Sequence, residues 1–202
     1  IVFSLANKRS ASFLRLFEKM NDTDASFNYS MAVDLRTSLF ADSNGTGDIR
    51  KDPTYNPAYP VRIIKFPNGG QNMGQFITNE EPSASPIVIF RLADAYLIKA
   101  EALARTGANA DAAAAMKPLM QKRDLGYTKN SVTVEDVLLQ RRIELWGEGF
   151  VYFDMRRNAL DCIRVYEGSN HPEWARKNYP AHDASWNYMI PQREVQENQW
   201  IE

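Results

Sequence analysis

Three segments of the sequence place aromatic rings next to amide or guanidinium groups, a combination that could bind a ligand with C–H faces and hydroxyl groups. Flat aromatic faces pack against C–H surfaces, while amides, carboxylates and guanidinium groups hydrogen-bond to hydroxyls. Residues 27–29 read FNY, residues 55–59 read YNPAY with an arginine at position 62, and residues 174–186 contain two tryptophans and a tyrosine. We expect the loop at 55–59 to make the main contacts, although a single ring in such a loop is more often a buried anchor. The candidate ligand-binding residues are Tyr55, Asn56, Tyr59, Arg62, Phe27, Asn28, Tyr29 and Trp186.

Residues that could serve catalysis or metal binding occur without the spacing that either requires. Residues 42–49 read DSNGTGDI, like the start of a calcium-binding loop, but Pro53 stands where that loop needs a bidentate glutamate. A polar turn is therefore the favoured interpretation. His171 and His182 lack an acid at a ligand spacing, and Cys162 is expected to be a small buried residue rather than a nucleophile. We predict no catalytic residue, no metal and no cofactor.

The composition is that of an ordinary folded protein. Of 202 residues, 44% are hydrophobic and 24% are charged, which allows a packed core and excludes wholesale disorder. The formal net charge of −1 gives no field that would attract nucleic acid. The apolar runs are far shorter than the ~20 residues of a membrane-spanning helix. The strand-like opening IVFSL carries no leader, so we expect a piece of a longer protein, with any signal peptide or lipid-bearing cysteine upstream.

After position 90 the apolar residues follow the period of helices. Leu92, Ala95, Tyr96, Ala100 and Leu103 predict the buried face of one helix. A glycine at position 107 would end it, and a second helix would run from a cap at position 109 or 111 to about 122. Small residues at positions 100 and 112 would let the two helices approach closely, with larger residues at 96 and 116 filling the space above. This arrangement is typical of a tetratricopeptide-like helical hairpin.

A third, long helix is predicted to begin at Thr133, with Asp136 completing a capping box. Glycines at positions 147 and 149 would kink this helix before it continues to about position 155. Its apolar face would comprise Val137, Leu138, Leu145 and Trp146. Elsewhere, residues 61–66 predict a strand and residues 67–70 a turn. Residues 31–40 fit a helix or a strand, and residues 187–194 predict an extended stretch.

Three blocks of the sequence resemble motifs of the SusD/RagB family, the nutrient-binding lipoproteins of the Bacteroidetes outer membrane. They are residues 91–102 (RLADAYLIKAEA), 141–157 (RRIELWGEGFVYFDMRR) and 190–198 (IPQREVQEN), in the order and spacing of the family. Departures occur at Asp94, Gln140 and Val151, where Glu, Glu and Arg are usual. We expect the charged residues of these blocks to pair on half-buried helix faces and to hold the scaffold together. The expected partners lie three or four residues apart along a helix. They are Glu101, Glu144, Glu148 and Asp154 with Arg141, Arg142, Arg156 and Arg157.

The resemblance implies a mainly α fold, with a tetratricopeptide-like helical hairpin plus a long helix, a loop-rich region and a few short strands. In this interpretation residues 1–202 form the C-terminal domain of a longer chain. Residues 21–75 would be the loop-rich region that meets the ligand or a partner, and residues 91–157 would be the helical scaffold.

The resemblance also implies a function without catalysis, the binding of oligosaccharides at the bacterial cell surface for uptake through a TonB-dependent transporter of the SusC type. A lipid anchor upstream of this sequence would hold the protein on the outer membrane, and no nucleic-acid partner is expected. Peptide-derived nutrients are the alternative ligand within the family, and a domain that contacts only the transporter is a further alternative. A glycan-degrading enzyme is the alternative from another class, and it needs two carboxylates facing one cleft. Its candidate carboxylates are Asp42, Asp48, Asp52, Glu80 and Glu81.

Overall fold

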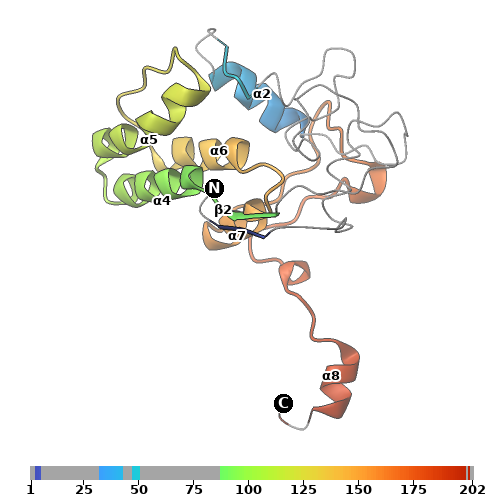
Figure 1. The fold of residues 1–202 in the computed structure, drawn as a ribbon. Helices are drawn as coiled ribbons and strands as arrows, with labels where there is room; N and C mark the ends of the chain where they lie inside the picture. Colours follow the sequence, from blue (N-terminus) through green and yellow to red (C-terminus); the bar gives the residue numbers. More distant parts are fainter. Residues whose placement is uncertain (1–2, 6–31, 43–46, 51–86, 199, 201–202) are drawn as a thin grey trace, which may run out of the picture. The chain divides into compact units, whose positions relative to one another are not determined.

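The structure is a computed structural model that describes residues 3–5, 32–42, 47–50, 87–198 and 200. The chain divides into two compact units, Ile1–Val151 and Tyr152–Glu202. The mainly α fold predicted from the sequence is confirmed (Figure 1). The helices are α2 (Val33–Asp42), α4 (Leu92–Arg105), α5 (Asn109–Arg123), α6 (Val134–Glu144), α7 (Phe150–Arg157) and α8 (Gln192–Glu197). The strands are β1 (Phe3–Leu5) and β2 (Ile87–Phe90), and the short 3-10 helices are η3 (Glu173–Ala175) and η4 (Ala184–Trp186).

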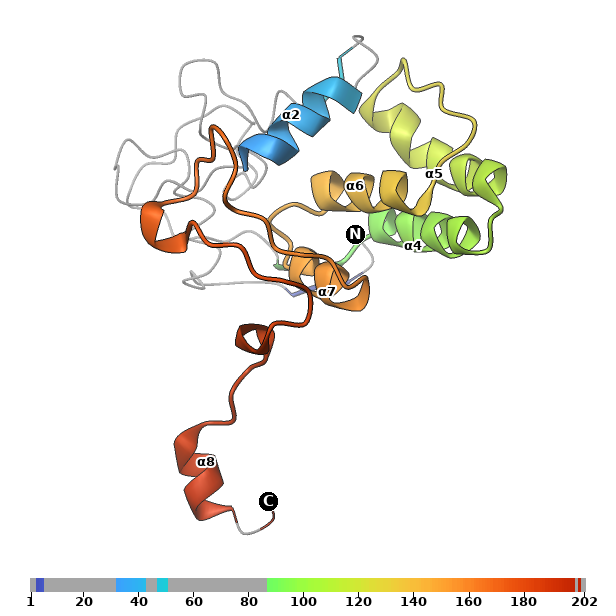
Figure 2. The ribbon, with the colours of Figure 1, turned by 180° about the vertical axis from the view of Figure 1, so that it is seen from behind.

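The first unit is built on the predicted helical hairpin. Helices α4 and α5 lie side by side, with α6 packed against α4 (Figures 1 and 2). Gly107 ends α4 with a φ of +81°, a left-handed conformation that favours glycine. Ala100 and Ala112 are fully buried between the helices, and Met116 is 1% exposed. Because small side chains let two backbones approach, these positions explain the close packing of the hairpin.

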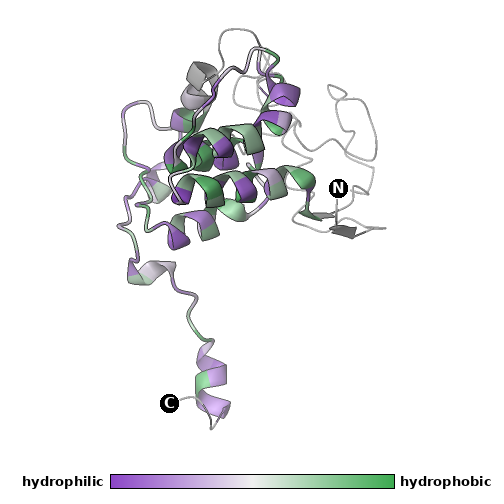
Figure 3. Cartoon of the chain, turned by 90° about the vertical axis from the view of Figure 1, so that its left-hand side faces the viewer, coloured by the Kyte–Doolittle hydropathy of each residue, from purple (hydrophilic) through white to green (hydrophobic). Residues whose placement is uncertain are grey.

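A single hydrophobic core joins α4, α5, α6 and the connection between α5 and α6. Hydrophobic and hydrophilic positions alternate around the turns of these helices, so that each offers an apolar side to the core (Figure 3). Tyr96 and Leu103 pack against this core while remaining partly exposed. The buried core residues are Ala93, Leu97, Ala100, Ala104, Ala112, Ala113, Met116, Leu119, Met120, Tyr127, Val132 and Val137.

The predicted buried face of α4 was correct in part, since Ala100 is completely buried and Tyr96 and Leu103 pack against the core. Leu92 is 56% exposed, whereas Leu97, which the apolar pattern left out, is completely buried. The buried face of α4 also includes the carboxylates of Asp94 and Glu101. A pattern that counts only apolar residues cannot register buried charges, so it left these carboxylates out of the buried face.

Helix α6 begins as predicted and ends earlier than predicted. The Thr133 hydroxyl accepts from the Asp136 amide at 3.3 Å, and the Asp136 carboxylate accepts from the Thr133 amide at 2.9 Å. This reciprocal pair is the capping box. The predicted kink is a complete break, because Gly147 and Gly149 adopt φ values of +75° and +85° between α6 and α7. The predicted cap of α5 was also wrong, since the N-cap residue is Ala108, whose side chain makes no capping hydrogen bond.

The remaining predictions of secondary structure concern the segments before residue 90. The strand-like opening forms β1, which pairs antiparallel with β2 through Phe3 and Phe90. The ambiguous segment at 31–40 is helical from Val33. The predicted strand at 61–66 and the predicted turn at 67–70 lie outside the described residues. None of the described helices is long and apolar enough to span a membrane.

The second unit consists mainly of loops held by backbone and side-chain hydrogen bonds. Cys162 and Tyr179 form an isolated antiparallel bridge, with N···O distances of 2.8 and 3.0 Å. Cys162 is half-buried rather than buried. The Asn178 side-chain oxygen accepts from the amides of residues 164 and 165, each at 2.9 Å. The predicted extended stretch at 187–194 ends at Pro191, because α8 begins at the next residue.

Candidate functional site

Trp186 is the predicted ligand-binding residue that falls within the described part of the chain, and it belongs to an aromatic cluster in the second unit. Its ring is stacked with Tyr152, with ring centroids 5.9 Å apart and planes at 24°. Phe153 meets Tyr152 edge to face at 5.3 Å, and Tyr188 lies tilted against Tyr152 at 5.7 Å. The Tyr152 hydroxyl also donates to the backbone carbonyl of Trp186. Tyr152 is therefore the centre of the cluster.

Local structure positions each ring of the aromatic cluster. Tyr152 and Phe153 are consecutive residues of α7, while Trp186 ends η4. The Asp183 carboxylate caps η4 by accepting from the Ser185 amide at 2.8 Å. The Ser185 hydroxyl, which donates to the same carboxylate at 2.6 Å, and the Ser185 amide lower the pKa of Asp183. This carboxylate stays charged and continues to hold the turn that presents Trp186.

The aromatic cluster combines exposed ring surface with polar groups. Phe153 and Tyr188 are 63% and 86% exposed, whereas Trp186 is half-buried. Arg156 lies one helical turn after Tyr152 and donates to the Asn187 side-chain oxygen at 2.8 Å. Rings next to an amide and a guanidinium group can pack against a sugar face and donate to its hydroxyls.

The other predicted ligand-binding residues lie outside the described residues, so their assignment stays a prediction. They are Phe27, Asn28, Tyr29, Tyr55, Asn56, Tyr59 and Arg62. Sequence reasoning missed the ligand-binding potential of Tyr152, Phe153 and Tyr188. The sequence signal for Tyr152 and Phe153 is the group of aromatic residues near Arg156. That signal does not reveal the contact between Tyr152 and Trp186, because this contact depends on the fold.

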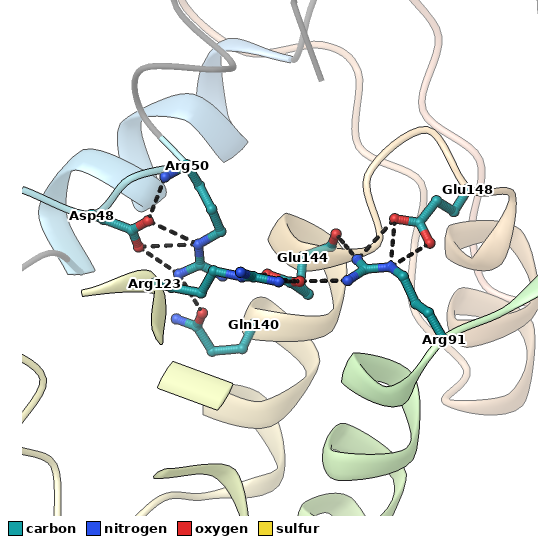
Figure 4. A network of polar contacts seen from close by, with 7 residues as sticks. All are labelled: Asp48, Arg50, Arg91, Arg123, Gln140, Glu144 and Glu148. Atoms are coloured by element: carbon teal, nitrogen blue, oxygen red, sulfur yellow. Dashed lines mark hydrogen bonds and ion pairs between the residues drawn. The ribbon is translucent and has the colours of Figure 1, made fainter. Parts of the chain in front are cut away.

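The charged residues of the family motifs form a buried polar network in the first unit (Figure 4). Glu144 on α6 is at its centre. Its carboxylate accepts from Arg91 at 2.6 Å and from Arg123 at 2.7 Å, and Arg50 lies 3.5 Å away. Arg91 also forms an ion pair with Glu148 at 2.8 Å. One carboxylate thus joins three segments that are far apart in the sequence.

Burial and the surrounding arginines compete to set the ionisation of Glu144. Burial is the strongest single influence and by itself would raise the pKa of Glu144. The hydrogen bond from Arg123 and the charge of Arg91 together outweigh it and lower the pKa from 4.5 to about 2. Burial likewise opposes the charge of Arg91, but its hydrogen bond with Glu148 and the charge of Glu144 raise its pKa overall. Glu144 and Arg91 are therefore ionised at neutral pH.

A second buried ion pair joins α4 to α6. Arg141 is 4% exposed and donates to Asp94 at 2.6 Å, with Glu101 at 3.9 Å. Glu101 also pairs with Arg105 on its own helix at 2.7 Å. Asp94, which stands where the family usually has Glu, still reaches its arginine. Arg141 with Asp94 and Glu101 thus neutralises charge between α4 and α6, as expected for a scaffold.

The predicted partners within single helices were correct only in part. Arg157 pairs with Asp154 at 2.7 Å as predicted. Arg142 instead meets Asp34 of α2 at 3.1 Å, and Arg156 bonds to an amide. The strongest contacts of Glu144 come from other elements of the unit rather than from its own helix.

Among the acidic residues proposed as catalytic carboxylates or calcium ligands, the structure describes one side chain, that of Asp48. Asp48 is 3% exposed, and its carboxylate binds Arg50 at 2.5 Å. Arg50 in turn donates to Gln140 at 3.0 Å. Within the described residues no group of three or more His, Cys, Asp or Glu side chains is arranged to hold a metal ion. Asp48 therefore acts as a structural partner of Arg50.

The fold and the buried network define a mainly helical protein built on a tetratricopeptide-like hairpin. The family model described as the SusD family matches residues 7–202. The chain belongs to the SusD family. A search of curated proteins found no match.

Two crystal structures share the fold. A SusD superfamily protein from Bacteroides thetaiotaomicron superposes with a TM-score of 0.72 at 22% identity, covering 98% of this chain and 46% of that protein. A SusD-like carbohydrate binding protein from Bacteroides vulgatus superposes with a TM-score of 0.68 at 22% identity, covering 96% of this chain and 46% of that protein. The chain thus spans about half the length of these two proteins.

Proposed function

We propose that this protein binds oligosaccharides without cleaving them, at the surface of the bacterial outer membrane. The bound glycan is passed to a TonB-dependent transporter of the SusC type for uptake. A lipid anchor outside this sequence holds the protein on the membrane. The residues predicted from the sequence to contact the ligand are Phe27, Asn28, Tyr29, Tyr55, Asn56, Tyr59, Arg62 and Trp186.

The observation that carries this proposal is the exposed aromatic cluster beside Arg156 and Asn187, in a member of the SusD family. Exposed rings next to hydrogen-bond donors are the surface that a pyranose needs. The relative from Bacteroides vulgatus is described as a carbohydrate binding protein, which supports the same class of ligand here.

The buried carboxylates support a role without acid–base chemistry. Glu144 is ionised and bonded to two arginines, and Asp94 is bonded to Arg141. A general acid must hold a proton near the working pH, which a carboxyl with a pKa of about 2 does not do. These residues serve the scaffold.

Calorimetric titration with maltoheptaose, cellohexaose, xylohexaose and a casein digest tests the ligand class, with a reducing-sugar assay on the same samples. We expect saturable heat with an oligosaccharide and no new reducing ends. Binding to the digest alone would replace the glycan with a peptide ligand. New reducing ends that disappear in Asp52→Asn or Glu80→Gln would instead establish an enzyme. Co-purification of a SusC-type transporter from solubilised outer membranes tests the proposed partner.

A further inference from the structure

We infer that Tyr188, together with Phe153, forms the ring surface that receives a sugar, and that Trp186 is a positioning residue beneath it. The inference rests on the proposed function and deepens it by naming the contact residues and the ligand class. That class is a neutral oligosaccharide whose pyranose rings present a C–H face.

Exposure separates the four rings of the aromatic cluster into two pairs. Tyr152 and Trp186 are half-buried and stacked on each other. Tyr188 and Phe153 are 86% and 63% exposed. A ligand in solution meets the exposed rings first, whereas the stacked pair has ring surface already covered by its partner.

The stacked pair keeps the exposed rings in place. Tyr152 contacts Phe153 at 5.3 Å and Tyr188 at 5.7 Å, and its hydroxyl donates to the Trp186 carbonyl two residues before Tyr188. Rings that are already held lose little freedom when a ligand stacks on them, which lowers the entropic cost of binding. Trp186 therefore acts on the ligand through the placement of Tyr188.

Polar donors border the ring surface on the side of residue 187. Arg156 donates to the side-chain oxygen of Asn187. This bond involves the amide oxygen and not the two N–H donors of the Asn187 side chain. The guanidinium group has further donors beyond the one in this bond. Sugar hydroxyls accept such bonds, and Asn187 is an exposed residue. The neighbouring Asp154 is neutralised by Arg157.

The side-chain donors of Asn187 and Arg156 beside the exposed rings, in a chain of the SusD family, commit the proposal to a sugar as the occupant. Arginine and aromatic residues are also enriched at protein–protein interfaces, so a protein is the alternative that the test must separate. A protein partner would also cover Met189, which follows Tyr188 and is 91% exposed. A sugar stacked on Tyr188 need not touch that side chain, which gives the two occupants different mutational signatures.

The test compares variants in calorimetric titrations with maltoheptaose, cellohexaose and xylohexaose. Tyr188→Ala is expected to weaken binding about tenfold, the change that corresponds to a loss of about 1.4 kcal/mol. Tyr188→Phe restores the ring and is expected to recover most of that loss. Asn187→Ala is expected to weaken binding several-fold. Trp200→Ala removes an 84% exposed ring that has no place in the cluster, and it is the matched control together with Met189→Ala.

Each outcome has a distinct meaning. If the unmodified protein binds none of the three oligosaccharides, the proposed function fails and this inference fails with it. If the protein binds but Tyr188→Ala matches the Trp200→Ala control, only this inference is overturned. Equal losses for Tyr188→Ala and Met189→Ala would also overturn it, in favour of a broader apolar contact. Unchanged thermal unfolding of Tyr188→Ala would separate a lost contact from lost structure.

Discussion

Replacing Glu144 with glutamine is expected to destabilise the protein by roughly 3 kcal/mol at pH 7. The fall in pKa of this carboxyl from 4.5 to about 2, at about 1.36 kcal/mol per pKa unit, corresponds to roughly 3 kcal/mol of stability from its ionised form. Removing one partner from a buried ion pair costs about 3–5 kcal/mol, which agrees. Glutamine keeps the shape of the side chain, so the loss reports the charge that faces Arg91 and Arg123.

The assay is urea unfolding followed by far-ultraviolet circular dichroism, repeated from pH 7 to pH 2. The folded-state pKa of Glu144 lies below its unfolded value, so its contribution is fully present above about 4.5 and disappears as the pH falls through about 2. The stability difference between the unmodified protein and Glu144→Gln should therefore shrink steadily over that window. Glu173→Gln changes an exposed glutamate and is the matched control, with almost no expected effect.

Two results would refute this reasoning about Glu144. One is an unfolding midpoint for Glu144→Gln at pH 7 equal to that of the Glu173→Gln control. The other is a stability difference that stays constant down to pH 2, because it would mean that the lost energy came from packing rather than from the carboxylate charge.

Three further substitutions test the scaffold by urea unfolding at pH 7. Thr133→Ala removes the capping box and is expected to cost about 1 kcal/mol; an unchanged midpoint would contradict the cap. Gly107→Ala places a Cβ on a residue with a left-handed backbone conformation and is expected to cost roughly 1–2 kcal/mol. Nothing lies within 4 Å of that Cβ, so the cost would come from backbone strain alone, and a neutral result would contradict such strain. Ala100→Leu overfills the hairpin and is expected to cost about 1–3 kcal/mol; a stabilised protein would disprove the close approach to Ala112.

The parts of the fold that could be predicted from the sequence are those whose signals are local. Thr133 and Asp136 are three residues apart, and Gly107 directly follows the C-cap residue Thr106 of its helix. Such features satisfy nearby backbone groups and need no knowledge of distant segments. The alanines at positions 100 and 112 were predicted correctly for a related reason, because a hairpin brings its own two helices together.

The rotation of α4 and the break at Gly147 depend on non-local contacts. Asp94 is buried because Arg141 comes from another helix 47 residues away to pair with it. The carboxylate of Glu144 meets arginines that are 53 and 94 residues away. Sequence patterns record the residue types but not these distances. The pair Asp154–Arg157 within one helix was therefore predicted correctly, whereas Glu144, Glu148 and Arg142 have partners from other elements.

Non-local contacts also limited what the sequence could predict about the aromatic cluster. Trp186 could be selected from the sequence because it stands among polar residues in a loop, whereas the exposure of each ring is a property of the packed unit. Tyr152, thirty-four residues before Trp186, stacks on the Trp186 ring, which was the candidate chosen from the sequence, whereas the Tyr188 side chain remains exposed. The different roles that we infer for Trp186 and Tyr188 therefore rest on burial rather than on residue type.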